Sequence, residues 1–376
     1  MIKRIFKTAS LLMAAAMLSV SCDPVENGST GGGTETPDGS LSLDADKLII
    51  QSNGEDAVTF TVKLGEEVVT DGVVFHDARN KDAVVDLPDG KFTATKEGEY
   101  EIWAEYRAKY TASVIITAVP TPVPENPEDP QPSSTSFAKK VLFAQFTDAT
   151  CGNCPVMKLS IKKAWEKYPD LKSKIVKVDI HSMSSLQKDP AYISCGVANT
   201  WPFCYVDFSA GISAMSSVDY NVNVIKKAID DRYSMPAKAQ VAVNAKYADG
   251  VITLKTVVKA AQTGKYRIGA WLKEDGIQGT QDDYYNMHEP WMDIFDDSAR
   301  ILDSKVSNTN YTGHLLGIIE AGKTAEKMFI MNLKPEWKVE NLELVVFVSA
   351  EENGFYTVTN VVEGPIDGEI KFAYAE

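Results

Sequence analysis

Residues 141–155 read VLFAQFTDATCGNCP, and this stretch decides the fold of the central part of the chain. Its first six residues form an apolar run broken only by Gln145, which is typical of a buried strand in a mixed or parallel sheet. From Pro155 to Tyr168 apolar residues recur at helical spacing, and proline is well tolerated in a first helical turn. The stretch therefore predicts a strand, a turn that carries two cysteines, and an amphipathic helix.

The two cysteines of this turn, Cys151 and Cys154, have the spacing of a redox site. Cys151 would lie at the start of the helix, where unpaired backbone N–H groups and the helix dipole stabilise a thiolate. That thiolate would attack a substrate disulfide, and Cys154 would resolve the mixed disulfide. A zinc site is the rival interpretation, but it needs more than two ligands, and no second Cys-x-x-Cys or histidine pair accompanies this one. We therefore predict neither a metal nor a cofactor.

A second motif, TWPF at residues 200–203, opens a further predicted strand. In order and spacing the two motifs resemble thioredoxin-like folds, in which a cis-proline loop faces the dithiol. The resemblance implies a cis bond before Pro202. Trp201 and Phe203 would offer an apolar lip to a bound peptide, or they are ordinary core aromatics. The predicted site comprises the catalytic residues Cys151, Cys154 and Pro202 and the substrate-binding residues Gly152, Asn153, Trp201 and Phe203.

The site departs from the thioredoxin pattern in its proton-handling groups. Thioredoxins carry a buried acid six residues before the first cysteine, and this place holds Gln145, which cannot relay a proton. Asp148 is nearer the motif, and we expect it in the turn. Cys195 and Cys204 are either bridged or two separate buried thiols, and we prefer separate thiols because cysteine packs well in cores. A short helix is expected to begin at Asp189-Pro190.

The first residues of the chain are typical of a targeting segment. Residues 1–21 combine a basic start, an apolar stretch and small residues before Cys22. We expect a lipoprotein signal peptide, with Cys22 lipidated and residues 22–39 acting as a flexible tether; an ordinary secretory signal is the alternative. The net charge of −14 and the lack of a basic footprint disfavour nucleic acid as a partner.

The remaining chain is predicted to form several domains. Residues 40–119 alternate like strands and carry turn signals at Asn-Gly and Asp-Gly pairs, which indicates a β-sandwich. The segment EGEYEIWA at 97–104 resembles a late strand of bacterial immunoglobulin-like domains, and a spacer role is preferred to adhesion. Residues 120–138 form a proline-rich linker. The thioredoxin-like domain spans 139–235, and a mostly-β sandwich domain spans 236–376, with a long loop from Gln278 to Tyr311.

A closer resemblance covers about two thirds of the chain, from Lys139 onward. Its motifs are the dithiol with Phe146-Thr147 and Pro155, the run LKEDGI at 272–277 with Gln281, Tyr285 and His288, and the late strands at 345–348 and 358–360. The chain is similar here to the twenty-eight-kilodalton outer-membrane protein family of Gram-negative anaerobes. The resemblance implies an outer-membrane lipoprotein, periplasmic or surface-facing, from a family of surface adhesins or receptors. It departs after His288, where Glu289-Pro290-Trp291 replaces an arginine.

Two functions follow from these observations. The first is a thiol-disulfide oxidoreductase that acts on envelope proteins or peptides bearing disulfides. The second is a binding or adhesion lipoprotein that keeps Cys151 and Cys154 as a stable structural disulfide. In both cases the lipid on Cys22 would join the protein to the membrane.

Overall fold

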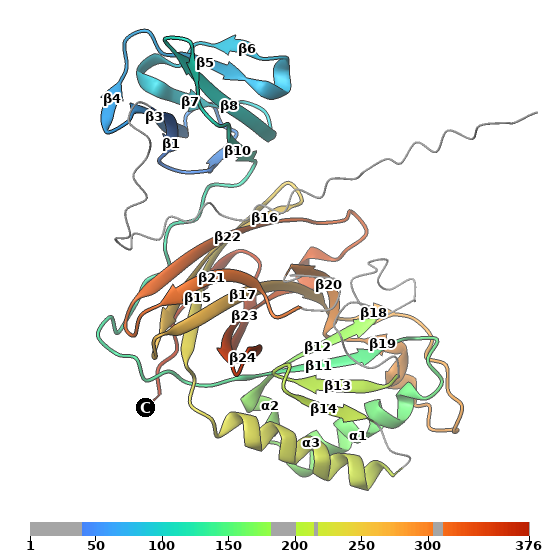
Figure 1. Ribbon diagram of the computed structural model, residues 1–376. Coiled ribbons are helices and arrows are strands. Elements are labelled where there is room, and N and C mark those ends of the chain that lie inside the picture. The colour runs from blue at the N-terminus through green and yellow to red at the C-terminus, as the bar shows by residue number, and fades with distance from the viewer. Residues whose placement is uncertain (1–39, 182–200, 214–216, 304–310, 376) are drawn as a thin grey trace, which may run out of the picture.

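The computed structural model describes residues 40–181, 201–213, 217–303 and 311–375. An N-terminal β unit lies at one end of the molecule, the helices lie together at the other end, and a large β region lies between them (Figure 1). The predicted targeting segment, the tether with Cys22, the helix expected at Asp189 and Cys195 lie outside the described residues.

The N-terminal unit consists of two sheets that enclose one core. The alternation of its strands places Val58 and Phe60 of one sheet against Ile102 and Ile116 of the other. At the predicted turn of residues 89 and 90 both residues have positive φ, which Gly90 adopts without strain. One sheet contains β1 (Leu41–Ala45), β3 (Ala57–Leu64), β4 (Glu67–Val69) and β7 (Lys91–Thr93). The other contains β2 (Ile49–Gln51), β5 (Val74–Asp77), β6 (Ala83–Val85), β8 (Gly98–Tyr106), β9 (Lys109–Tyr110) and β10 (Val114–Val119), and short 3-10 turns span Ala78–Asn80 and Pro88–Gly90.

An α/β unit follows, and its central strand is the predicted one. The strand β11 (Val141–Thr147) is buried along its whole length. It pairs in parallel with β12 (Ile175–His181) and antiparallel with β13 (Phe203–Val206), which pairs with β14 (Ala210–Ser213). The helices are α1 (Cys154–Lys167), α2 (Leu171–Lys174) and α3 (Val218–Tyr233). Apolar side chains of α1 and α3, such as Met157 and Ile225, cover the face of the sheet that carries Phe143.

The C-terminal region is a sandwich of two sheets. The first has the order β22 (Thr324–Asn332), β16 (Val251–Ala260), β15 (Ala239–Ala248) and β25 (Gly368–Ile370). It packs on strands β17 (Gly264–Glu274) and β23 (Leu342–Glu352) through a core that includes Leu254, Ile268 and Val346. Further strands are β18 (Ile277–Gln278), β19 (Ile294–Phe295), β20 (Ser298–Asp303), β21 (His314–Ile319) and β24 (Phe355–Pro365), with 3-10 turns at Pro290–Asp293 and Val339–Asn341.

The α/β unit and the C-terminal region are joined by one continuous sheet. Strand β12 pairs with β20 at Asp179 and Ser298, and the combined order is β14-β13-β11-β12-β20-β17-β23-β24. The prediction of a long loop over residues 278–311 is therefore wrong, because β20 lies inside it. The face of β11 and β12 that points away from α1 packs Val178 against Trp271 and Phe347 of the C-terminal strands. The two predicted domains thus share a sheet and a core.

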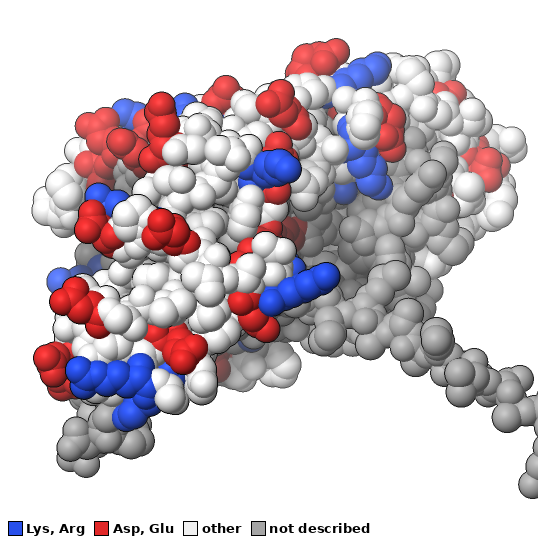
Figure 2. All heavy atoms as spheres, turned by 90° about the horizontal axis from the view of Figure 1, so that it is seen from above, with Lys and Arg blue, Asp and Glu red and all other residues white. Residues whose placement is uncertain are grey.

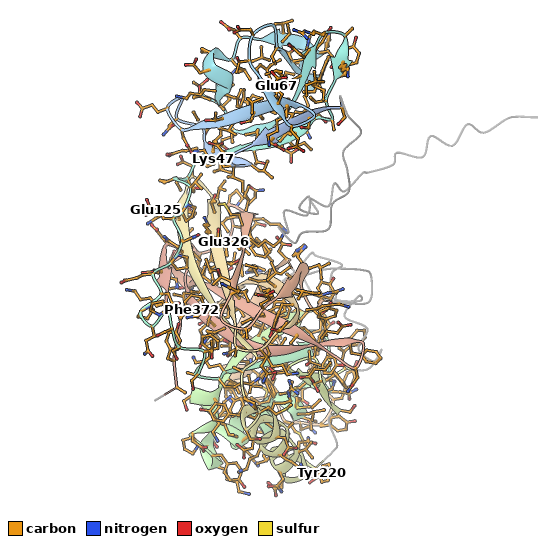
Figure 3. The ribbon with its side chains drawn as sticks, turned by 60° about the vertical axis from the view of Figure 1, so that its left-hand side comes forward. Lys47, Glu67, Glu125, Tyr220, Glu326 and Phe372 are labelled. Carbon is orange, nitrogen blue, oxygen red and sulfur yellow. A yellow bond between two sulfur atoms is a disulfide. The ribbon has the colours of Figure 1, made fainter. Side chains whose placement is uncertain are left out.

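The proline-rich segment after β10 is extended, but it lies against the C-terminal sandwich. Lys259, only 2% exposed, donates to Asp129 at 2.8 Å and to the carbonyl oxygens of Gln131 and Pro132 at 3.1 and 2.7 Å. Glu125 and Glu326 mark the place where this segment runs beside the sandwich (Figure 3). Its contacts make the segment a part of the folded surface.

Candidate functional site

The dithiol lies in a tight turn between β11 and α1. Cys151 and Cys154 form a disulfide. Cys154 is the first residue of α1, whereas Cys151, which was expected at the helix start, lies three residues earlier in the turn. Asp148 lies in the turn as expected, where its carboxylate accepts from the backbone N–H and the hydroxyl of Thr150 at 3.0 and 2.7 Å. Cys154 is fully buried and Cys151 is half-buried. Of the two sulfur-bearing residues, Cys151 is the one that solvent reaches.

The second predicted motif lies at the same end of the sheet as the dithiol. Phe203 pairs with Phe146 in the antiparallel ladder, which brings the preceding Pro202 to the carboxyl end of β11. The peptide bond between Trp201 and Pro202 is cis, as predicted. Trp201 and Phe203 pack against the core shared with the C-terminal strands, which favours the interpretation as core aromatics. Whether they also form a lip for a peptide stays a prediction.

Polar side chains lie in the layer between the sheet and α1. In the ladder Gln145 stands beside Asp179 of β12 on one side and Cys204 of β13 on the other, so the three side chains share one face. Burial raises the pKa of Asp179, which also pairs with Lys177, and raises the pKa of the free Cys204 thiol well above its usual value. The acid that thioredoxins carry at this place is thus replaced by Gln145 on β11, and the buried carboxyl of Asp179 lies on the neighbouring strand β12.

A lysine of α1 reaches the same buried layer. Lys158, one turn after Cys154, donates to the carbonyl oxygen of Met292 at 3.3 Å and lies 4.1 Å from the ring centre of Phe295. Burial lowers the pKa of Lys158 to about 8, although Asp179 opposes the shift. The first turns of α1 therefore contact a segment of the C-terminal region.

This segment, which we name the strap, comprises residues 279–293 between β18 and β19. The backbone N–H groups of Asp282 and Tyr284 donate to the carbonyl oxygens of Ala149 and Gly152 at 2.7 and 2.9 Å. The side-chain amide nitrogen of Gln281 lies 3.1 Å from the carbonyl oxygens of Asp148, Ala149 and Cys151. The strap therefore satisfies the carbonyl groups of the dithiol turn.

The ring of Tyr284 lies directly over the dithiol turn. A Cβ atom at Gly152 would stand 2.4 Å from that ring, so only glycine allows this approach. Tyr284 is nevertheless 72% exposed, which means that the ring covers Gly152 while projecting from the surface. Asn153 is exposed beside it, and Gly152 is buried.

The strap residues show what sequence reasoning found and missed. Gln281 and Tyr285 were singled out by the family resemblance alone, without any expected contact to the cysteines. The structure brings Gln281 to the dithiol turn, and it adds Asp282 and Tyr284, for which the sequence carried no signal. Their contacts join positions about 130 residues apart, as the 130-residue separation of Gln281 and Cys151 illustrates.

The fold and the site define a class: a mostly-β protein of several units, with a disulfide at a helix start and an attached β-sandwich. The model of the family described as outer membrane protein Omp28 matches residues 191–368. The chain is therefore related to the Omp28 family of outer-membrane proteins, and this family places it at the outer membrane. The match begins later than the resemblance seen in the sequence, which started near Lys139. A comparison with curated proteins finds no match.

Two solved structures are similar to parts of the chain to different degrees. HBP35 of Porphyromonas gingivalis shares 17% identity over 62% of this chain and 77% of its own, with a TM-score of 0.50. A domain of the outer membrane lipoprotein Omp28 from the same organism has 16% identity over 35% of this chain and 89% of its own, with a TM-score of 0.24. At such identities the likeness to HBP35 concerns the fold alone.

The surface has two further features that bear on function. Within the described ranges, none of the helices has the length and apolar character needed to cross a membrane. On the face drawn in Figure 2, Lys and Arg side chains are interspersed with Asp and Glu. That face therefore presents mixed charge, as is usual for a surface that meets solvent.

Proposed function

We propose that this protein is an outer-membrane lipoprotein whose Cys151–Cys154 pair exchanges disulfides with exported proteins or peptides. The anchor would be a lipid on Cys22, the N-terminal unit an immunoglobulin-like spacer, and the α/β unit a thioredoxin-like domain. One observation carries the proposal: the disulfide joins a half-buried Cys151 to a buried Cys154 at the start of α1. In this arrangement an incoming thiolate meets one sulfur only, and the other is held as its leaving group.

The exchange balances as follows in the direction that starts from the disulfide. A substrate thiolate attacks the sulfur of Cys151, the bond to Cys154 breaks, and Cys154 leaves as a thiolate. A second substrate thiolate then attacks the substrate sulfur of the mixed disulfide and releases Cys151. The substrate is oxidised to a disulfide, and the protein is reduced to a dithiol. The N-terminus of α1 stabilises the Cys151 thiolate that results.

Proton handling in this proposal falls to groups outside the usual position. Gln145 has an amide nitrogen with no hydrogen-bond partner among the described residues, and it cannot titrate. Asp179 lies beside it, and its raised pKa lets the carboxyl hold a proton at a higher pH than an exposed aspartate does. We propose that Asp179, and not a residue of β11, is the carboxyl that holds a proton in the layer between the sheet and α1.

The experiment is an exchange assay with a peptide dithiol and the full chain. Wild-type protein should oxidise the peptide in proportion to its own loss of disulfide. Cys151→Ser should abolish this reaction, and Cys204→Ser, which removes a buried free thiol, should leave it unchanged. Equal rates for wild type and Cys151→Ser would refute the exchange function.

The second candidate is a binding lipoprotein with a structural disulfide. The specific observation in its favour is the strap, whose backbone occupies the carbonyl groups of the dithiol turn. A redox titration separates the candidates: an exchanging pair equilibrates with glutathione buffers, whereas a structural disulfide has a potential below about −300 mV and stays oxidised in them.

A further inference from the structure

The strap is built as a fixed part of the site. The carboxylate of Asp283 accepts from the backbone N–H groups of Tyr285 and His288 at 2.9 and 2.8 Å. The carboxylate of Asp293 accepts from the backbone N–H of Gln281 at 2.9 Å and lies 2.9 Å from the Nε2 atom of His288. These hydrogen bonds lie within the strap, so they hold residues 279–293 in one conformation independently of the contacts with the dithiol turn.

The strap is also attached on both sides of the dithiol. On the turn side it bonds the carbonyl groups of residues 148, 149, 151 and 152 through Gln281, Asp282 and Tyr284. On the helix side Lys162 pairs with Glu289 at 3.3 Å and lies 4.8 Å from the ring centre of Trp291. Because the strap is bonded both to the dithiol turn and to α1, we expect it to stay in place and not to open as a hinged lid.

We propose that the strap selects the partners of the Cys151–Cys154 disulfide by size, admitting small thiols and hindering folded protein surfaces. Attack on a disulfide requires access to one sulfur along the direction of the breaking bond. Cys154 is fully buried, so the approach is to Cys151, whose neighbour Gly152 lies under the projecting ring of Tyr284. A small thiol passes beside such a ring, whereas a broad protein surface meets the ring before its thiol reaches the sulfur.

The inference rests on the proposed function and narrows its partners from exported proteins or peptides in general to those whose thiol is not set in a broad folded surface, and it needs only that the disulfide be reducible. Its test is therefore stoichiometric reduction of the full chain and not turnover. The two reductants are dithiothreitol and a small folded protein that carries a surface dithiol. Loss of the Cys151–Cys154 bond is followed by alkylation and mass spectrometry. The variant is Tyr284→Ala, and the matched control is Tyr285→Ala, which removes the neighbouring exposed tyrosine side chain.

We expect Tyr284→Ala to speed reduction by the protein dithiol about tenfold, which corresponds to roughly 1.4 kcal/mol of lost hindrance. Reduction by dithiothreitol should change by less than about twofold, the size of a modest surface effect. Tyr285→Ala should change neither rate. The proposal is overturned if Tyr284→Ala leaves the protein reaction unchanged, or if it speeds both reactions equally, because equal acceleration indicates general loosening.

A second variant tests the same ring from the opposite side. Gly152→Ala places a methyl group where the ring of Tyr284 lies, so the ring must swing away. We expect the same selective acceleration of the protein reaction, and none beyond that of Tyr284→Ala when the two substitutions are combined. If the exchange assay fails but Tyr284→Ala still speeds only the reduction by the protein dithiol, the proposed function is rejected and this inference stands. If exchange occurs but Tyr284→Ala does not selectively speed the protein reaction, this inference is rejected and the proposed function stands.

Discussion

The buried polar side chains beneath α1 contrast with the apolar packing around them. His181 ends β12 with its side chain fully buried, and its ring packs edge-on against Phe295 of β19. Its Nε2 atom lies 3.3 Å from the hydroxyl of Ser298. Burial, together with the charge of Lys158, lowers the pKa of His181 to about 3. The folded protein therefore holds this imidazole neutral throughout the physiological range.

A pH dependence of stability follows from this histidine. In the unfolded chain His181 binds a proton below its ordinary pKa of 6.5, whereas in the folded chain it does so only near 3. The fold should therefore lose stability as the pH falls from 6.5 toward 3, by up to about 1.4 kcal/mol per pH unit. Urea unfolding at pH 7, 6, 5 and 4 should show a shallower pH slope for His181→Gln than for the wild type. The half-exposed His288, replaced by Gln, is the control, and identical slopes for wild type and His181→Gln would contradict the prediction.

At the scale of elements, the segment between β10 and β11 is the one whose behaviour differs most from its expected role. Its prolines keep it extended, as a linker requires. However, Lys259 of β16, Asn244 of β15 and Thr253 of β16 hold it along the sandwich, with Thr253 bonded to the hydroxyl of Thr121 at 2.6 Å. The segment that leads to β11 is therefore held against the sandwich by hydrogen bonds along its course.

We expect Lys259 to contribute more than any other single side chain to holding this segment against the sandwich. Lys259→Met keeps the apolar stem but removes the ammonium that binds Asp129 and two carbonyl groups. Because it breaks a mostly buried charge pair, we expect a loss of about 2 to 4 kcal/mol in unfolding free energy. Limited proteolysis should then cut within residues 120–136.

The control for this prediction is a lysine that also bonds the segment but at the surface. Lys371 pairs with Glu128, and their side chains are 50% and 72% exposed. Lys371→Met should destabilise the fold far less than Lys259→Met, because exposed ion pairs contribute little to stability. If both substitutions have equally small effects, burial of Lys259 does not fasten the segment.

At the scale of the whole molecule, the α/β unit depends on the C-terminal sandwich. The face of β11 and β12 opposite α1 is completed by Trp271, Phe347 and other side chains of the C-terminal strands. Charged groups follow the same junction: Lys273 of β17 binds Asp297 at 2.9 Å and Glu363 of β24 at 3.0 Å. The N-terminal unit, in contrast, has its own closed core.

This difference predicts how fragments behave. A fragment of residues 139–235 exposes the apolar face that Trp271 and Phe347 cover, so it should fail to fold as a soluble monomer. A fragment of residues 40–119 should unfold in one cooperative transition, because both of its sheets and their core are retained. Circular dichroism during heating and size-exclusion chromatography measure both outcomes. A monomeric, cooperatively folded 139–235 fragment would show that the boundary near residue 235 separates independent domains.

Much of the local structure was predictable because local sequence determines it. The apolar run of β11, the proline at the first turn of α1 and the turn residues 89 and 90 each act through neighbours a few residues away. The position of Pro202 was predictable only through resemblance to a known fold. The error at residues 278–311 arose because β20 is short and polar at its ends, and it becomes a strand by filling the place between β12 and β17.

By itself the sequence determined where the disulfide turn, its strand and its helix lie, since periodicity and turn chemistry act within a few residues. The tertiary structure alone decided what covers that turn: the strap, the shared sheet and the buried carboxyl of Asp179. The physical reason is that such contacts join segments that are far apart in the chain. No local pattern records them, because burial and hydrogen-bond partners form only once distant strands are in place.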